Sequence, residues 1–194
     1  MSFKFVGGKV LDGRFEPEGI YLGAPFDGRA EVTQGWGEHP EFYGKWRYNG
    51  VRVKGHIGID FALEPGTRLL AVDSGRVVEI SIERGGFERY VKLEHRWGES
   101  LYGNAGDVLV EAGQMVARGD PIALSALFIQ TPQPFHFAVR IAPFNRHDGW
   151  GGFTDPQPFL PPDCLLLPEN SDEGAAPARR LHPMADEKPN MRRP

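Results

Sequence analysis

Apolar and polar residues alternate along several short stretches in the middle of this chain. The clearest is residues 135–141, FHFAVRI, in which every second residue is aromatic or aliphatic. A period of two predicts a half-buried β-strand. Phe135, Phe137 and Val139 then form one apolar row directed into a core, whereas His136 lies on the opposite face. An isolated histidine in that position requires an explanation.

Other strand-like runs follow the same pattern, at residues 68–72, 76–82, 89–94, 107–111 and 121–124. Turn signals such as EPG, DSG, RGG, EAG and RGD separate them. The chain has 25 Gly and 17 Pro, and helical periodicity is hard to find. The pattern therefore predicts an all-β fold of antiparallel sheets, arranged as a sandwich or a barrel.

Two segments depart from this pattern. Residues 35–48, GWGEHPEFYGKWRY, interleave aromatic with polar and turn residues, which is typical of a loop that covers a core or lines a groove. Residues from 168 onward are rich in Pro and charge, with no aromatic residue, and predict a disordered tail or one ordered by a partner. We therefore expect an N-terminal extension (1–24), one domain (25–165) and a flexible tail (166–194).

Bulk properties exclude several classes of function. The 194 residues carry a net charge of -4, which gives no basis for binding nucleic acid. Cys164 is the only cysteine, so an internal disulfide and a zinc site built from cysteines are excluded. No stretch is apolar enough for a signal peptide or a membrane helix. We expect synthesis in the cytoplasm and no membrane contact.

The stretch HIGID carries the candidate chemistry. Gly58 and the β-branched residues Ile57 and Ile59 disfavour a helix. On a strand, His56 and Asp60 share a face with Gly58 between them, so no side chain separates the two polar groups. Ile57 and Ile59 are then predicted to point into the core.

A third ligand would complete a metal site. His136 is the natural candidate, because it is another strand histidine whose apolar neighbours point the other way. Two imidazoles and a carboxylate suit zinc and leave a fourth position open. The alternative structure contains no metal: His56 and Asp60 form an ion pair, and His136 is a hydrogen-bonded histidine.

The wider sequence resembles the lysostaphin/LytM-type zinc metalloendopeptidases, which cut the peptide cross-links of bacterial peptidoglycan. The resemblance is carried by GHIGIDFA, by PGTRLLAVDSGRV, by VKLEHRWGESLY, by VEAGQMVARGDPIA and by PFHFAVR, and it spans roughly residues 25–162. It implies a β-rich duplicated-hybrid-motif fold, with a groove across one sheet and zinc on the floor of the groove. His56, Asp60 and His136 match the three zinc ligands.

The resemblance also implies a defect. The family has a catalytic histidine at the first position of an H-x-H motif and another after the tyrosine of a Y-x-H stretch. Pro134 and Asn104 stand at these positions here. Proline has no polar side-chain atom, and asparagine cannot carry a proton at neutral pH. His39, in the aromatic loop, is a candidate substitute. The residues expected to line the groove are Trp36, His39, Tyr43, Trp46 and Tyr102.

Three functions remain open at this stage. The first is a peptidoglycan-directed protein that keeps its zinc but is weak or inactive as an endopeptidase. The second is an active endopeptidase with a rearranged proton-transfer residue, and the third is a non-catalytic structural or hydrolase-regulating module. Peptidoglycan peptide stems or cross-bridges are the expected partners, with other virion or cell-wall proteins. The expected place of action is the cell wall or a phage tail. A biotinyl- or lipoyl-carrier role is discounted, because Lys92 lies within a strand-like run rather than on a hairpin tip.

Overall fold

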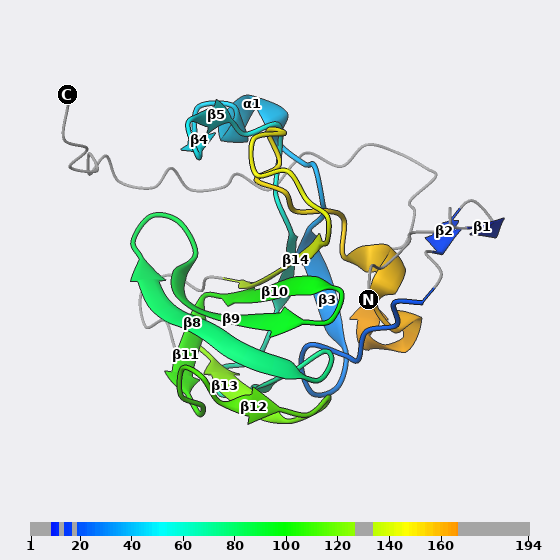
Figure 1. Ribbon diagram of the computed structural model, residues 1–194, viewed down its shortest axis with the longest axis vertical. Helices are drawn as coiled ribbons and strands as arrows, with labels where there is room; N and C mark the ends of the chain where they lie inside the picture. The colour runs from blue at the N-terminus through cyan, green and yellow to red at the C-terminus, as the bar shows by residue number, and fades with distance from the viewer. Residues whose placement is uncertain (1–8, 12–13, 17–18, 127–133, 167–194) are drawn as a thin grey trace.

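The structure is a computed structural model that describes residues 9–11, 14–16, 19–126 and 134–166. Most of its strands belong to one large and one small sheet, in which neighbouring strands are antiparallel except for the parallel pair β3 and β15 (Figure 1). The large sheet has the strand order β12-β8-β9-β10-β14-β6-β3-β15. Its members in chain order are β3 (Ala30–Gln34), β6 (Ile59–Ala62), β8 (Gly75–Glu83), β9 (Glu88–His95), β10 (Gly98–Gly103), β12 (Met115–Val116), β14 (Phe135–Ile141) and β15 (Leu165–Leu166).

The remaining elements are short. The small sheet has the order β11-β13-β7. Its strands are β7 (Arg68–Leu70), β11 (Ala105–Val108) and β13 (Pro121–Ser125). Two hairpins are formed by β1 (Lys9–Leu11) with β2 (Arg14–Glu16), and by β4 (Arg47–Tyr48) with β5 (Val51–Arg52). The helices are α1 (Pro40–Tyr43), η1 (Gln157–Phe159) and η2 (Pro162–Cys164). The prediction of an all-β fold of antiparallel sheets is confirmed.

The main core lies between the two sheets. Phe61 and Phe137 from the large sheet and Leu69 and Ala123 from the small sheet belong to one cluster of buried side chains. Burying such side chains contributes roughly 1.5–3 kcal/mol for each large apolar one. The alternation in β14 produces this arrangement, because its odd-numbered residues through Val139 enter this cluster.

A second apolar cluster lies on the opposite face of β14. It consists of the buried side chains of Val53, Ile57, Tyr90, Leu101, Ala138 and Phe153. Five half-buried rings, which we call the aromatic roof, pack against it: Trp36, Tyr43, Tyr48, Phe87 and Trp150. The expectation that Ile57 shares a core with Ile59 is therefore wrong. Regular strand geometry begins only at Ile59, and His56 is bonded to the preceding loop through Glu38 O, so the alternation does not extend back to Ile57.

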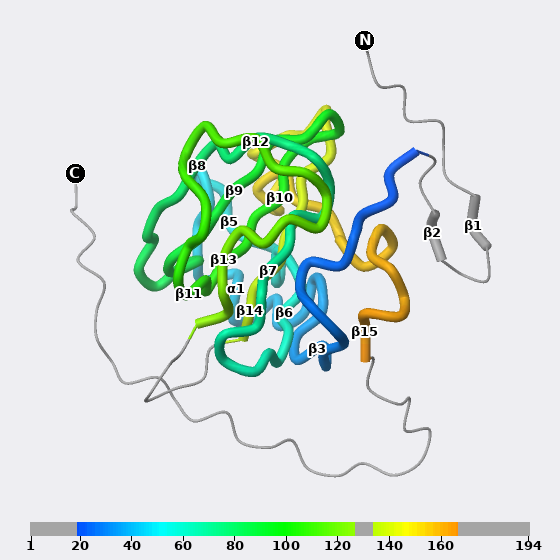
Figure 2. Tube along the Cα trace, turned by 90° about the horizontal axis from the view of Figure 1, so that it is seen from below, coloured from blue at the N-terminus to red at the C-terminus, as the bar shows by residue number. Residues whose placement is uncertain are grey.

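The segment that follows residue 19 runs beside the segment that ends in β15 (Figure 2). Leu22 N donates to Phe159 O over 3.1 Å, and Ile20 and Leu22 are buried in the main core. The packed unit thus begins before residue 25. The predicted tail lies outside the described residues except for Leu166. No helix in the described ranges is long and apolar enough to span a membrane.

The aromatic loop forms α1 and the β4–β5 hairpin, which stand together above the large sheet (Figure 1). Asn49 and Gly50 connect the two strands and both have positive φ, at 49° and 79°. Asn-Gly in this conformation is the preferred two-residue turn of a β-hairpin. Tyr48 and Val51 are half buried, whereas the neighbouring residues Arg47 and Arg52 are exposed. The hairpin therefore has one face toward the protein and one toward solvent.

Candidate metal centre

Three buried polar side chains converge where β14 meets β6. Asp60 and His136 are paired directly across these strands, and His56 lies just before β6. Asp60 Oδ1 is 2.8 Å from His136 Nδ1 and 3.2 Å from His56 Nε2, and the two nitrogens are 3.1 Å apart. Zinc bonded to nitrogen or oxygen at about 2.0–2.1 Å in a tetrahedron places its ligand atoms about 3.3 Å apart. The triangle of atoms is close to that size.

The hydrogen bonds of His56 support a cation at this point. Its Nδ1 lies 3.0 Å from Gly35 O, and a carbonyl oxygen only accepts, so Nδ1 carries the hydrogen. In the neutral ring Nε2 is then a lone pair, directed at the Asp60 carboxylate and at His136 Nδ1. His56 Nε2 and Asp60 Oδ1 are then two lone-pair atoms 3.2 Å apart, which repel each other unless a metal ion or a proton on His136 Nδ1 lies between them. The donor set fits a metal ion, and Gly35 fixes the His56 tautomer that a metal requires.

The protonation states of Asp60 and His136 also fit metal binding. Burial raises the pKa of the Asp60 carboxyl, but the adjacent rings of His136 and His56 outweigh burial and lower the pKa to about 2. Burial lowers the pKa of His136 below its usual value, although Asp60 opposes this effect. At neutral pH the site therefore presents a carboxylate and a neutral imidazole, which are the forms that bind metal.

Gly58 makes room for the third ligand. A Cβ at Gly58 would lie 2.5 Å from His136 Cε1 and 2.5 Å from Phe137 O. The glycine thus provides space for the ring of His136, rather than simply leaving the gap between His56 and Asp60 open. Nε2 of His136 is buried and has no hydrogen-bond partner among the described residues.

We expect Gly58→Ala to weaken zinc binding by about 10- to 100-fold, because the added methyl group displaces the His136 ring. The measurement is zinc affinity by competition with a chromogenic chelator. Ala62→Ser, an exposed change four residues later at the end of β6, is the control and should leave the affinity unchanged. Wild-type affinity in Gly58→Ala would contradict the assigned role of the glycine.

Asn104 and Pro134 lie together beside the three candidate ligands. Gly103 pairs with His136 across β10 and β14, and Asn104 follows Gly103 directly. Asn104 Nδ2 donates to Pro134 O over 2.7 Å, while its Oδ1 is buried and has no hydrogen-bond partner within the described ranges. Asn104 has a φ of 55°, a left-handed conformation that asparagine tolerates well. The residue thus forms the turn between β10 and β11 and joins it to the start of β14.

The structure brings some of the expected groove residues to the metal centre. Tyr43 lies over His56 with ring centroids 5.4 Å apart, and its hydroxyl accepts from Gln34 Nε2 over 2.9 Å. Burial, with a further contribution from Asp60, raises the pKa of Tyr43 to about 12. Trp36 stacks on Trp150 at 4.8 Å. Tyr43 and Trp36 both come from the aromatic loop and belong to the aromatic roof, so the loop both covers a core and borders the site.

Other expected residues lie elsewhere. Tyr102 is fully buried in the main core, where its hydroxyl accepts from Val72 N over 2.9 Å, so its side chain does not line a groove. The reason is alternation: Tyr102 pairs with Phe137, and both point to the core face. Trp46 is 42% exposed. His39 is exposed, with its ring nitrogens 4.0 and 3.8 Å from the carboxylates of Glu38 and Glu41.

Sequence reasoning missed two neighbours of the metal centre. The ring of Phe87 lies 5.2 Å from that of His136, and Gln34 pairs with Asp60 across β3 and β6. Phe87 follows an ordinary RGG turn, and nothing in that local sequence indicates contact with a residue 49 positions later. The position of Gln34 directly before GWG was the available signal for a site role.

Two histidines and one carboxylate that leave a fourth position open are a ligand set of catalytic zinc sites, including those of metallopeptidases. The comparisons agree with this class. The model of peptidase family M23 matches residues 54–147. An uncharacterized metalloprotease of Haemophilus influenzae is 37% identical over 92 residues, which are 46% of this chain and 19% of that relative. The match thus spans about a fifth of the relative's length.

Two solved structures are similar in both fold and sequence. The catalytic domain of the antimicrobial peptidase lysostaphin from Staphylococcus simulans has a TM-score of 0.53 and 25% identity, covering 67% of this chain and 91% of that one. A zinc-containing peptidase from Vibrio cholerae has a TM-score of 0.52 and 26% identity, covering 77% and 45%. The chain belongs to the lysostaphin/LytM-type metallopeptidases of family M23.

Proposed function

We propose that this protein binds zinc through His56, Asp60 and His136 and binds the peptide cross-links of peptidoglycan, with hydrolysis that is very slow or absent. The observation that carries this proposal is the direct contact between Asn104 and Pro134 beside the three ligands. These are the two positions at which the resemblance places catalytic histidines. The convergence of the ligand atoms supports a retained metal, and the loss of both proton carriers supports impaired catalysis.

The remaining groups favour binding over cleavage. Zinc at this site would polarise a peptide carbonyl and lower the pKa of a water to about 7. Among the described residues, Asn104 Oδ1 is a buried acceptor without a partner and suits the N–H of a peptide. Tyr43 keeps its proton at neutral pH, so its hydroxyl can donate a hydrogen bond but does not act as a base there. General acid–base help is worth about 100- to 10,000-fold, and neither Asn104 nor Pro134 supplies it.

The test is to measure metal content and cleavage on the same preparation. We expect about one zinc per chain and at least about 100-fold slower digestion of purified peptidoglycan than with lysostaphin. His136→Ala should lose the zinc. A wild-type chain without zinc after gentle purification would refute the metal site, and brisk cleavage would refute the proposed loss of catalysis.

A rearranged active enzyme is the second candidate. His39 has the chemistry to carry a proton, but its ring contacts are with Glu38 and Glu41 on the exposed side of α1. His39→Ala should therefore leave any residual cleavage unchanged. A role as a virion or cell-wall component, or as a regulator of other hydrolases, is compatible with binding without cleavage and rests on the same loss of proton carriers.

A further inference from the structure

The stretch that precedes the first metal ligand is strongly basic. Residues 45–54, KWRYNGVRVK, contain no acidic residue in a chain whose net charge is -4. The four cations are Lys45, Arg47, Arg52 and Lys54, and all four are exposed. We call the solvent-facing side of this stretch the basic hairpin face.

Two of the cations oppose each other. Arg47 and Arg52 are directly paired across β4 and β5, a position in which like charges destabilise a hairpin. Their guanidinium groups contact carbonyl oxygens, Gly50 O at 2.9 Å and Gly44 O at 3.4 Å. Within the described residues, no carboxylate lies within 4.0 Å of either guanidinium. An anion placed between them would remove the repulsion.

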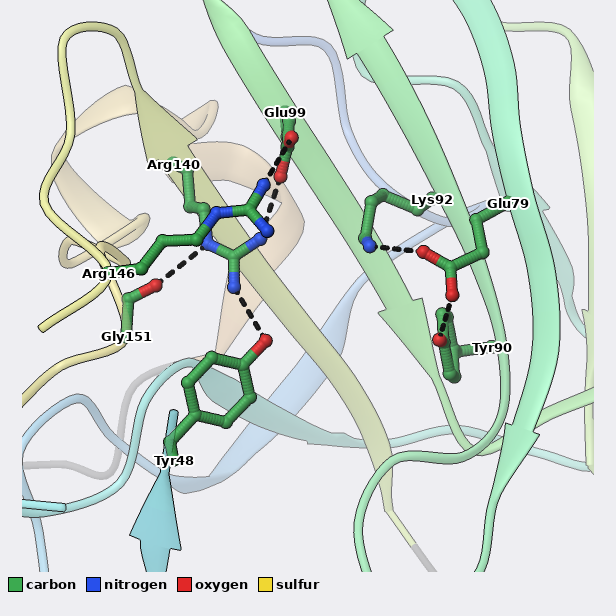
Figure 3. A network of polar contacts seen from close by, with 8 residues as sticks. All are labelled: Tyr48, Glu79, Tyr90, Lys92, Glu99, Arg140, Arg146 and Gly151. Carbon is green, nitrogen blue, oxygen red and sulfur yellow. Dashed lines mark hydrogen bonds and ion pairs between the residues drawn. The ribbon is translucent and has the colours of Figure 1, made fainter. Parts of the chain in front are cut away.

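The hairpin is fixed to the sheet rather than free. On its inner side, Tyr48 accepts a hydrogen bond of 2.7 Å from Nη2 of the buried Arg140 (Figure 3). Arg140 also donates to Glu99 over 2.7 Å and to Gly151 O over 2.9 Å, and its guanidinium carbon lies 3.9 Å from the ring centre of Phe153. The backbone that carries the basic hairpin face is therefore held in place before any ligand arrives.

The same loop connects this face to the metal centre. Trp46 N donates to Tyr43 O over 2.9 Å, and the ring of Tyr43 lies over His56. Along the chain, the basic hairpin face therefore begins within a few residues of the ring that lies over His56. Trp46 is 42% exposed there and offers an apolar surface beside the arginines.

From these observations we infer that the basic hairpin face binds carboxylate groups of the peptide that occupies the metal centre, an inference that rests on the proposed function. Guanidinium groups pair with carboxylates through two parallel hydrogen bonds, and Arg47 and Arg52 together present this chemistry on one face. The ligand is an acidic peptide, such as the carboxylate-bearing peptide chains of peptidoglycan. Binding should weaken as salt screens these exposed charges.

The test compares sedimentation of the zinc-loaded protein with two preparations of purified peptidoglycan, one native and one with its carboxylates converted to ethanolamine amides. Arg47→Ser with Arg52→Ser should weaken binding to native peptidoglycan by at least about 10-fold. Arg29→Ser with Arg84→Ser is the matched control, because it removes two exposed arginines elsewhere, and it should bind as wild type does. The amidated preparation should bind wild type as weakly as native peptidoglycan binds the hairpin variant.

The outcomes separate the two proposals. If wild type binds native peptidoglycan and the hairpin variant binds equally well, the basic hairpin face has no such role while the proposed function stands. Equal binding of wild type to native and amidated peptidoglycan would also overturn the inference. A preference for duplex DNA or anionic lipid vesicles over peptidoglycan would overturn it in favour of another polyanion. Failure of wild type to bind native peptidoglycan at all would refute the proposed function itself.

Discussion

Replacing Asn104 and Pro134 together by histidine is expected to raise the rate of peptidoglycan hydrolysis by about 100- to 10,000-fold, the contribution that placed acid–base groups make. The two side chains would enter beside His136, which pairs with the neighbour of Asn104 and follows Pro134 by two residues. The backbone at position 104 is compatible, because histidine is among the residues that tolerate left-handed φ. Release of soluble peptides from purified peptidoglycan measures the rate.

Two controls separate proton transfer from simple remodelling. Asn104→Gln with Pro134→Ala changes the same positions without adding a group that titrates near neutral pH, and it should not increase hydrolysis. The histidine variant combined with His136→Ala should lose the gain along with the metal. A zinc-loaded histidine variant that is no faster than the glutamine–alanine control would show that the two positions do not act in the chemistry.

Arg140→Met is expected to reduce the free energy of unfolding by about 3–5 kcal/mol, the usual cost of removing one member of a buried ion pair. The guanidinium of Arg140 is 1% exposed, and all three of its nitrogens donate hydrogen bonds within the protein (Figure 3). Its loss leaves the Glu99 carboxylate, whose side chain is 20% exposed, with Arg146 at 3.2 Å as its one ion-pair partner among the described residues. Urea-induced unfolding gives the free energy.

The chain supplies a matched control for Arg140. Arg76 also joins a glutamate on the neighbouring strand, with Nη2 2.8 Å from Glu94, but both side chains are 55% exposed. Arg76→Met should therefore cost less than about 1 kcal/mol. Equal losses in the two variants would contradict the view that burial, rather than the ion pair alone, makes Arg140 important.

Alternation along the sequence was enough to predict much of the large sheet. The run 135–141 is strand β14, and the runs 76–82 and 89–94 lie within β8 and β9. Strand β10 was missed, because GESLYG contains two glycines and reads locally as a loop. Its pairing with β9 and β14 makes it a strand, and that pairing is a tertiary interaction that the local sequence does not contain.

The candidate metal ligands could be proposed from residue type and spacing, and the structure brings the three together. The surroundings of these ligands could not be predicted from the sequence, because they depend on contacts between residues that are distant along the chain. Arg140 alternates in phase with His136, so its face was predictable, but its partners Glu99 and Tyr48 lie 41 and 92 positions away. Likewise, Tyr102 was expected in the groove because it lies in a motif near the site, and the register of β10 turned it into the core.

Segments that pack around the second apolar cluster would recognise a ligand, and other parts of the chain hold the candidate metal ligands. The ligand residues Asp60 and His136 lie on paired strands of the large sheet, whereas the rings of the aromatic roof and the basic hairpin face come from segments that pack onto that sheet. Insertions or substitutions in the loop at 36–53 can therefore alter what is recognised without shifting the strand register that aligns the ligands. Such modularity allows a lineage to change its binding preference while the same scaffold persists.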